Sequence, residues 1–199
     1  MYDELSLGGV SVRLHVLQLG LRVQSASTGG KIGRATGMNF GRTGGVGVGT
    51  RAPSFTLPSQ SGEEVSLESL LERGPVVLFF YPADDTPGCT KEACAFRDDW
   101  GRFEEFGAEV VGISSDSVES HRRFAEKHSL PFVLLSDEGG RVRRLYRVPT
   151  TFGILPGRAT YVIDEHGVVR HMFSSQLGVS RHVGEAIAAL ASAERNELP

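Results

Sequence analysis

The sequence predicts an α/β fold in which helices cover a mostly parallel or mixed sheet. A continuous apolar run, Val76–Phe80, lies between Gly74-Pro75 and Pro82. Such a run is typical of a central strand that is buried on both faces. Further along the chain, segments with helical apolar spacing alternate with short strand-like runs, and this alternation indicates a layered α/β domain.

The other elements of this domain follow in chain order. Apolar residues alternate on both sides of a turn at 59–62, which predicts a β-hairpin across 55–67 ahead of the central strand. We then expect helices at 88–106, 118–127, 141–146 and from 180 onward, and strands at 109–114 and 132–135. A second hairpin, 159–163 with 168–173, closes the series and adds antiparallel strands to the sheet.

Composition limits the class of protein. The chain has 199 residues, of which 40% are hydrophobic and 23% charged, and its formal net charge is −3. These values are ordinary for a globular domain and give no reason to expect a nucleic-acid partner. No apolar run approaches the roughly 20 residues that span a bilayer, so we expect no membrane insertion. The glycine-rich motifs of nucleotide-binding folds are also missing from the sequence.

Residues 1–48 differ in composition from the rest of the chain. The first 50 residues hold 12 of the 25 glycines and carry a net charge of +3, against −6 for the remainder. We therefore assign 1–48 to an N-terminal extension, too poor in apolar surface to order itself, and 49–199 to the folded domain. The basic, acid-poor extension is similar to an organelle transit peptide, whereas Asp3 and Glu4 favour a plain tail or a true start at Met38. The predicted location is cytoplasmic, or plastid if the extension is a transit peptide.

Two cysteines follow the central strand. Cys89 and Cys94 are the only two in the chain, and so close a pair indicates chemistry rather than a disulfide framework. Thr86 has the residue type of a helix N-cap, and Pro87 suits the first helical position, so Cys89 falls in the first turn. Free backbone N–H groups and the helix dipole favour a thiolate there. A thiolate is the form that attacks a peroxide O–O bond, and the first product is a sulfenic acid.

The segment around Cys89 resembles a known family. Pro82, Thr86 and Cys89 match the peroxiredoxin pattern Pro-x-x-x-Thr/Ser-x-x-Cys. The string DDTPGCTKEAC is similar to the peroxiredoxin Q (bacterioferritin comigratory protein) branch, which has a second cysteine five residues after the first. The resemblance runs over residues 49–190 and includes LPGRATYVID, which is most like plant and cyanobacterial members.

This resemblance implies a fold and a role for each site residue. The fold would be a thioredoxin-like α/β sandwich with a central mixed sheet and an added N-terminal β-hairpin. Cys89 would be the peroxidatic thiol and Cys94 the resolving thiol. Thr86 would hydrogen-bond the bound peroxide, Pro82 would shield the pocket, and Arg158 would match the active-site arginine of the family. A guanidinium beside the sulfur would stabilise the thiolate and polarise the peroxide oxygens.

The implied activity is that of a thioredoxin-dependent, atypical two-cysteine peroxiredoxin. Hydrogen peroxide and organic hydroperoxides would be reduced through a sulfenic acid at Cys89 and an intramolecular disulfide with Cys94. Thioredoxin or a similar thiol reductant would then restore both thiols. The resemblance implies no cofactor and no metal. Relatives in this branch are often monomeric, so we expect a monomer.

The spacing of the two cysteines requires motion if both lie on one helix. Five residues along an α-helix place the two Cα atoms roughly 8–9 Å apart. A disulfide needs Cα atoms about 4.4–6.8 Å apart. We therefore expect residues 88–95 to unwind before Cys94 reaches Cys89.

Other interpretations of the cysteines stay open. A free cysteine is often only a small buried hydrophobe, and Cys94 fits that role as well. A zinc site would need two further ligands, but His121 and His128 lack a close ligand spacing. A thiol hydrolase would need a histidine oriented against Cys89, yet we interpret the six histidines as surface residues. A thiol–disulfide oxidoreductase would have Cys-x-x-Cys spacing, and a redox sensor or binding module is a third class.

Three remaining features receive structural interpretations. Asp84 and Asp85 are typical turn and capping residues. The segment 150–152 fits loop packing, although it could line the pocket. Aromatic residues at helical spacing predict the core-facing side of the 88–106 helix, and they are Phe96, Trp100, Phe103 and Phe106.

Overall fold

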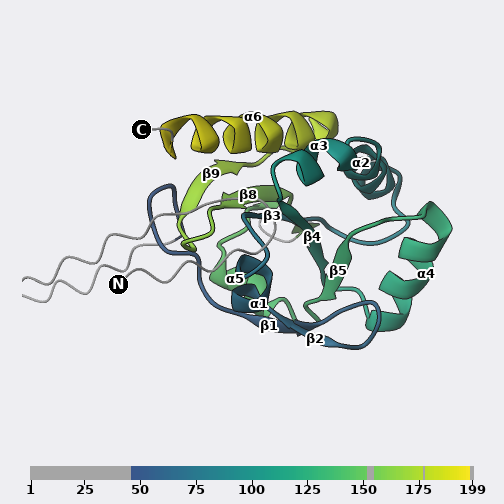
Figure 1. Cartoon of the computed structure of the whole chain (residues 1–199). Coiled ribbons are helices and arrows are strands. Elements are labelled where there is room, and N and C mark those ends of the chain that lie inside the picture. Colours follow the sequence, from purple (N-terminus) through teal and green to yellow (C-terminus); the bar gives the residue numbers. More distant parts are fainter. Residues whose placement is uncertain (1–45, 152–154, 177, 198–199) are drawn as a thin grey trace, which may run out of the picture. The chain divides into compact units, whose positions relative to one another are not determined.

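The computed structural model describes residues 46–151, 155–176 and 178–197. Strands and helices alternate along this part of the chain (Figure 1). In chain order they are β1 Thr56–Pro58, β2 Glu64–Ser66, α1 Leu67–Leu71, β3 Val76–Phe80, α2 Pro87–Asp98, α3 Trp100–Glu105, β4 Glu109–Ser114, α4 Val118–His128, β5 Val133–Ser136, α5 Arg141–Leu145, β6 Thr150–Thr151, β7 Leu155–Pro156, β8 Ala159–Ile163, β9 Val169–Phe173 and α6 Val179–Glu197. The expected α/β class is confirmed.

A five-stranded sheet with strand order β5-β4-β3-β8-β9 forms the centre of the domain. β3 pairs in parallel with β4, and β4 in parallel with β5. β8 runs antiparallel to β3, and β9 antiparallel to β8. The sheet is therefore mixed, with the second predicted hairpin supplying its antiparallel strands. β1 and β2 form the added N-terminal hairpin as a separate two-stranded sheet.

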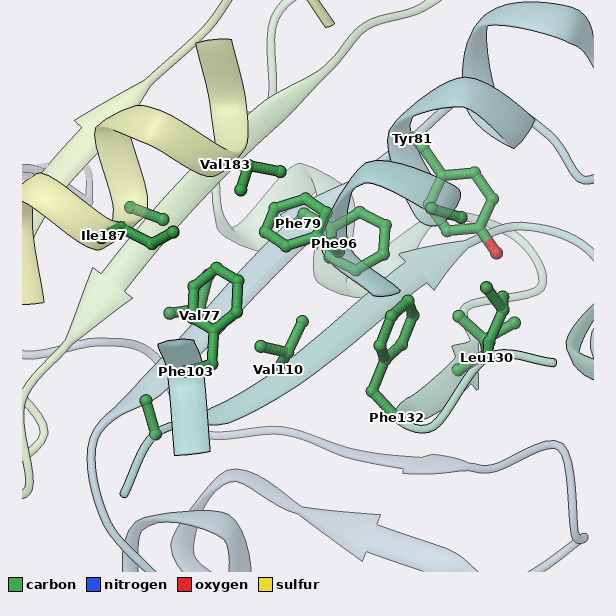
Figure 2. Close-up of a cluster of buried hydrophobic side chains, with 14 of the residues drawn as sticks. Val77, Phe79, Tyr81, Phe96, Phe103, Val110, Leu130, Phe132, Val183 and Ile187 are labelled. Carbon is green, nitrogen blue, oxygen red and sulfur yellow. The ribbon is translucent and has the colours of Figure 1, made fainter. Parts of the chain in front are cut away.

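β3 is buried along its whole length because helices cover both faces of the sheet. Successive side chains of a strand point to opposite faces, so Val77 and Phe79 join one core while Leu78 and Phe80 join the other. Side chains of α2, α3, α4 and α6 complete the first core, part of which Figure 2 shows. The second core is completed by α1, α5 and the β1–β2 hairpin. The rings of Phe79 and Phe96 stack with centroids 4.4 Å apart, which fixes α2 on the central strand.

Two expected elements differ in the structure, and the short strands β6 and β7 were not expected from the sequence. The helix expected at 88–106 is two helices, α2 and α3, which meet at Asp99, where φ is −97° and ψ is 11°. Aromatic side chains of both helices still face one core, which is why the apolar periodicity continues across the break. The second strand of the first hairpin ends at Ser66, because Ser66 and Ser69 form a capping box that starts α1.

Most of the N-terminal extension, residues 1–45, lies outside the described residues. Its interpretation as a transit peptide or a tail therefore stays a prediction. Across the part of the chain that the structure describes, no helix combines the length and the apolar character needed to cross a membrane.

Candidate active site

Cys89 lies in the first turn of α2, directly after the loop that leaves β3. The helix begins at Pro87, and the backbone of Thr86 has the extended conformation of an N-cap. Cys89 is 1% exposed, so its sulfur is almost completely removed from water. Unpaired backbone N–H groups and the positive end of the helix dipole favour an anion at this position.

The register of the sheet brings Arg158 to Cys89. β8 runs antiparallel to β3 and pairs Ala159 with Phe80, so the residue before β8 lies at the end of β3 where the site begins. Nη2 of Arg158 donates a hydrogen bond to Sγ of Cys89 at 3.2 Å. Arg158 is 5% exposed, and a buried positive charge is screened far less than one in water. The pair can therefore hold a thiolate.

A buried glutamate that the sequence analysis did not single out shares this guanidinium. Nη1 of Arg158 forms an ion pair with Oε2 of Glu92, which is fully buried. Glu92 follows Cys89 by three residues, a spacing that places both side chains on one face of α2. Burial raises the pKa of Glu92 to about 7, although the charge of Arg158 opposes this shift. One guanidinium thus contacts two side chains of the same helix.

A second arginine, Arg143 on α5, donates hydrogen bonds to two backbone carbonyls of the site. Its Nη2 donates to the carbonyl of Tyr81, and its Nη1 donates to the carbonyl of Gly157 at 2.8 Å. These bonds tie the end of β3 to the segment that precedes β8. Burial lowers the pKa of Arg143, while the charges of Asp137 and Cys89 oppose that shift. Arg143 therefore adds a second positive charge near the sulfur.

Thr86 does not cap α2 with its side chain, contrary to its expected role. Its Oγ1 instead donates a hydrogen bond to the carbonyl of Ala83 at 3.1 Å. The hydroxyl therefore points back into the loop, and only the backbone of Thr86 has the conformation of an N-cap. With its proton used in this way, the oxygen keeps its lone pairs for a donor such as a hydroperoxide O–H. Pro82 lies in the same loop and is partly buried.

The loop between β3 and α2 is anchored by a buried polar network. Asp84 accepts hydrogen bonds from the hydroxyls of Tyr81 at 2.7 Å and Ser120 at 2.8 Å. Its Oδ2 lies 2.9 Å from Nδ1 of His121. The interpretation of Asp84 as only a turn residue is therefore incomplete. The prediction of a surface histidine is wrong for His121, which is fully buried because α4 packs it beneath this loop.

Cys94 lies on the same unbroken helix as Cys89, and both thiols are free. Cys94 is partly buried. An intact helix keeps the two Cα atoms roughly 8–9 Å apart. A disulfide between them is therefore incompatible with this conformation of α2.

The described residues offer no geometry for a zinc site or for a histidine-activated thiol hydrolase at Cys89. No three His, Cys, Asp or Glu side chains gather there as metal ligands. His121 belongs to the Asp84 network, and His128 lies 3.6 Å from Asp85. Thr150 is exposed, and Phe152 lies outside the described residues, so its part in a pocket stays a prediction.

Comparison with known proteins identifies the family. Residues 48–172 match the AhpC/TSA family. The chain belongs to the AhpC/TSA family. This chain is 52% identical over 158 residues to the chloroplastic peroxiredoxin Q of Oryza sativa subsp. japonica. The alignment covers 79% of this chain and 72% of the rice protein. The resemblance to peroxiredoxin Q is thereby confirmed.

Solved structures agree on the fold of this AhpC/TSA chain. Peroxidoxin BcpB from Mycobacterium tuberculosis is 43% identical with a TM-score of 0.69, covering 74% of this chain and 97% of that one. The bacterioferritin comigratory protein of Xanthomonas campestris, described for its alkyl peroxide reduction activity, is 29% identical with a TM-score of 0.64, covering 70% and 91%. The expected thioredoxin-like fold is confirmed, and membership of the family supports thiol peroxidase activity.

Gly88 leaves the room that the guanidinium of Arg158 occupies. A Cβ at Gly88 would lie 2.8 Å from Nη2 of Arg158, closer than side-chain atoms normally approach. We expect Gly88→Ala to displace the guanidinium from Cys89 and to slow peroxide reduction about tenfold or more. Thermal stability should fall, because the gain of about 1 kcal/mol from alanine in a helix is smaller than the cost of disturbing the buried pair of Arg158 with Glu92. Stopped-flow rates and melting curves measure the two effects.

Gly101→Ala is the matched control for this change. Gly101 is the second residue of α3, as Gly88 is of α2, and a Cβ there would meet nothing within 4 Å. It should leave the peroxide rate unchanged. Equal rates for Gly88→Ala and the wild type would contradict the importance of the Arg158–Cys89 contact.

Proposed function

We propose that the chain reduces hydroperoxides with Cys89 as the peroxidatic thiol and recycles through a disulfide with Cys94. The main support is the contact between Arg158 and Cys89 at the N-terminus of α2. Burial, a helix N-terminus and a guanidinium are combined at this sulfur. The helix N-terminus and the guanidinium favour a thiolate and so oppose the effect of burial, which on its own disfavours the charged form.

In the first step, the thiolate of Cys89 attacks the nearer oxygen of the peroxide. An S–O bond forms while the O–O bond breaks, and its electron pair leaves on a hydroxide or alkoxide that takes up a proton. The products are a sulfenic acid and water or an alcohol. Arg158 stabilises the negative charge as it passes from sulfur to the leaving oxygen. The hydroxyl oxygen of Thr86 accepts a hydrogen bond from the O–H of the peroxide, and Pro82 shields the sulfur from water.

In the second step, the thiolate of Cys94 attacks the sulfenic sulfur of Cys89, and the hydroxyl leaves as water after it takes up a proton. Because both cysteines start on an intact helix, α2 has to unwind across 88–95 first. Unwinding also separates Arg158 from Cys89 and Glu92, since both lie on this stretch. A dithiol reductant of the thioredoxin type then reduces the disulfide and allows α2 to fold again.

The substrate range follows from the reaction and from the relatives. The attack on sulfur needs only an O–O bond, so hydrogen peroxide and organic hydroperoxides both qualify. The alkyl peroxide reduction named for the Xanthomonas campestris relative favours organic hydroperoxides as substrates here.

Peroxide loss, measured beside insulin reduction, tests this function against thiol–disulfide exchange on proteins. With thioredoxin and its reductase present, we expect hydrogen peroxide and cumene hydroperoxide to disappear catalytically. The chain alone, supplied with dithiothreitol, should not accelerate insulin reduction, because it lacks the Cys-x-x-Cys spacing. Insulin reduction without peroxide turnover would contradict the proposal and favour the oxidoreductase interpretation.

Hydrogen exchange tests the unwinding of α2. We expect the amides of 88–95 to exchange much faster in the disulfide form than in the reduced form, because the backbone hydrogen bonds of that stretch are lost. The amides of β4 should change little and serve as the internal control, because β4 is hydrogen-bonded within the sheet to β3 and β5. Identical protection of 88–95 in both forms would contradict an unwinding step.

The location of the chain is proposed to be the plastid. The rice relative is named as chloroplastic, which favours the transit-peptide interpretation of residues 1–48. A reporter fused to 1–48 should enter isolated chloroplasts, while the reporter alone should not. Exclusion of the fusion would favour the cytoplasmic alternative.

A further inference from the structure

The structure buries two of the histidines that were expected at the surface, His121 on α4 and His182 on α6. The prediction for His182 is therefore wrong as well, and its two ring nitrogens are bonded to Thr160 and to the carbonyl of Ser175. His121 lies instead beneath the loop between β3 and α2. It is a buried titratable group beside the site, and neither chemical step gives it a role.

The partners of His121 determine where its protons lie. Its Nε2 is 3.2 Å from the carbonyl oxygen of Leu135, which only accepts hydrogen bonds. Its Nδ1 is 2.9 Å from Oδ2 of Asp84. Two lone pairs so close together would repel each other without the screening of water, so a proton has to lie between these two atoms. The hydroxyl of Tyr81 is 3.4 Å from Nδ1, but it gives its proton to Oδ1 of Asp84 at 2.7 Å.

This proton belongs to the ring rather than to Asp84. Imidazole is a much stronger base than a carboxylate. Asp84 also accepts hydrogen bonds from the hydroxyls of Tyr81 and Ser120, and such bonds favour the charged form of a carboxyl group. Burial and the charge of Asp84 raise the pKa of Tyr81 well above its usual value, so this hydroxyl keeps the proton that it donates. Both nitrogens of His121 are therefore donors, and the ring is an imidazolium paired with a buried carboxylate.

Asp84 in turn orients the peptide unit that binds the hydroxyl of Thr86. The carbonyl of Ala83 and the N–H of Asp84 belong to one planar peptide group. The N–H donates to Oδ2 of Asp116 at 3.0 Å, while the carbonyl accepts the hydrogen bond of Thr86 at 3.1 Å. The direction of the Thr86 hydroxyl, and of the lone pairs that it keeps for a peroxide, therefore depends on how firmly His121 and its neighbours hold Asp84.

The next residue of the loop, Asp85, shows that the loop needs such a restraint. Its φ is 55°, in the left-handed region that costs free energy for residues other than glycine. Its carboxylate accepts a hydrogen bond from Nζ of Lys127 at 2.7 Å, but both side chains are at least half exposed. A salt bridge in water contributes little to stability. The buried contacts of Asp84 therefore supply most of the restraint.

We propose that His121 is a positioning residue for peroxide reduction, because as an imidazolium it holds Asp84 and so fixes the loop that presents Thr86 to the peroxide. This role rests on the proposed function. The thiolate of Cys89 does not depend on the contact, since Arg158 and the start of α2 stabilise it. Loss of the contact should therefore slow the attack on peroxide and leave the thiolate equally reactive toward other electrophiles.

Nitrogen NMR tests the state of the ring without any turnover. In the reduced wild type at pH 7, both ring nitrogens of His121 should have the chemical shifts of protonated imidazole nitrogens. The signals are assigned by their loss in His121→Gln, and the exposed His166 provides the reference for a ring in contact with solvent. A Nδ1 of His121 without a proton would overturn the proposal.

Two amide variants test the role of His121, each made together with Cys94→Ser so that Cys89 is the only thiol. The side-chain nitrogen of asparagine falls near the position of Nδ1, whereas that of glutamine falls near Nε2. His121→Gln therefore loses the donor to Asp84, and its single-turnover reaction with hydrogen peroxide should slow about tenfold or more. His121→Asn keeps that donor and should recover most of the rate. A peroxide rate in His121→Gln equal to that of Cys94→Ser alone would overturn the proposal.

Alkylation by iodoacetamide separates positioning from general damage to the site. This reaction needs the thiolate of Cys89 but no hydrogen bond with Thr86. Its rate should therefore be the same in Cys94→Ser and in both variants of His121. Alkylation that slows as much as peroxide reduction in His121→Gln would mean that His121 only supports the fold, and this result too would overturn the proposal.

Asp164→Asn is the matched control for a weakened buried carboxylate pair. Asp164 is 5% exposed and accepts a hydrogen bond from Nε of Arg170 at 2.6 Å. It follows β8 at the end of the sheet opposite Cys89, because Ile163 pairs with the first residue of β3. Its peroxide rate should match that of Cys94→Ser alone, and a loss as large as in His121→Gln would overturn the proposal. Failure of Cys94→Ser to react with peroxide would instead contradict the proposed function, while NMR would still decide the state of His121.

Discussion

Cys89→Ser protein is expected to lose peroxide turnover by roughly 10⁴-fold or more, to the level of the uncatalysed reaction. A serine hydroxyl remains protonated where a cysteine beside Arg158 becomes a thiolate, so the nucleophile is lost. The fold should persist, because serine has nearly the same size and its oxygen can accept the hydrogen bond that Arg158 now gives to sulfur. Thioredoxin-coupled peroxide consumption measures the loss.

Cys94→Ser is the paired variant that separates the two roles. It should consume one equivalent of peroxide in a rapid burst and then stop with thioredoxin as reductant, because the attacking thiol survives but the resolving thiol does not. Full activity in Cys89→Ser would contradict the peroxidatic assignment. It would favour the interpretation of the chain as a redox sensor or binding module.

Arg158→Met should slow the reaction of Cys89 with peroxide by roughly 10²- to 10³-fold, because the guanidinium stabilises both the thiolate and the leaving oxygen. The same change leaves Glu92 buried without its cation. Loss of one partner of a buried ion pair typically costs about 3–5 kcal/mol of unfolding free energy. Single-turnover rates and urea unfolding at pH 7 measure the two effects separately.

The double variant Arg158→Met with Glu92→Gln separates catalysis from stability. Replacing the carboxylate by an amide removes the buried negative charge, so much of the lost unfolding free energy should return. The peroxide rate should stay low, since the charge beside Cys89 is still missing. Recovery of the rate together with stability would mean that Arg158 acts only through the fold.

Much of the fold was predictable from the sequence because it depends on local patterns. Val76–Phe80 reads as a buried strand since both of its faces are apolar, and the structure buries all five residues. The break between α2 and α3 at Asp99 could not be predicted, because the aromatic spacing that indicates a helix is continuous across it. Helix α1 was missed because Leu67 continues the alternation of the preceding strand.

From the residues themselves the site was predictable only where they are adjacent in sequence, whereas Arg158 was predicted through the family resemblance alone. A reactive thiol could be predicted from residues 82–94, because the N-cap residue type, the proline that starts the helix and Cys89 all lie within this one segment. The contact of Arg158 with Cys89 depends on the pairing of β8 with β3, which composition and spacing do not reveal. The burial of Glu92 and His182 depends likewise on the packing of α6 on α2, and a polar residue type alone predicts exposure.

Trapping of the sulfenic acid tests the central claim most directly. Cys94→Ser protein is mixed with one equivalent of hydrogen peroxide and then with dimedone, which adds to sulfenic acids, and the labelled peptide is identified by mass spectrometry. We expect one dimedone adduct, on Cys89, and no adduct in Cys89→Ser treated in the same way. An adduct on Cys94 in Cys89→Ser, with none on Cys89 in Cys94→Ser, would contradict the assignment of Cys89 as the thiol that attacks the peroxide.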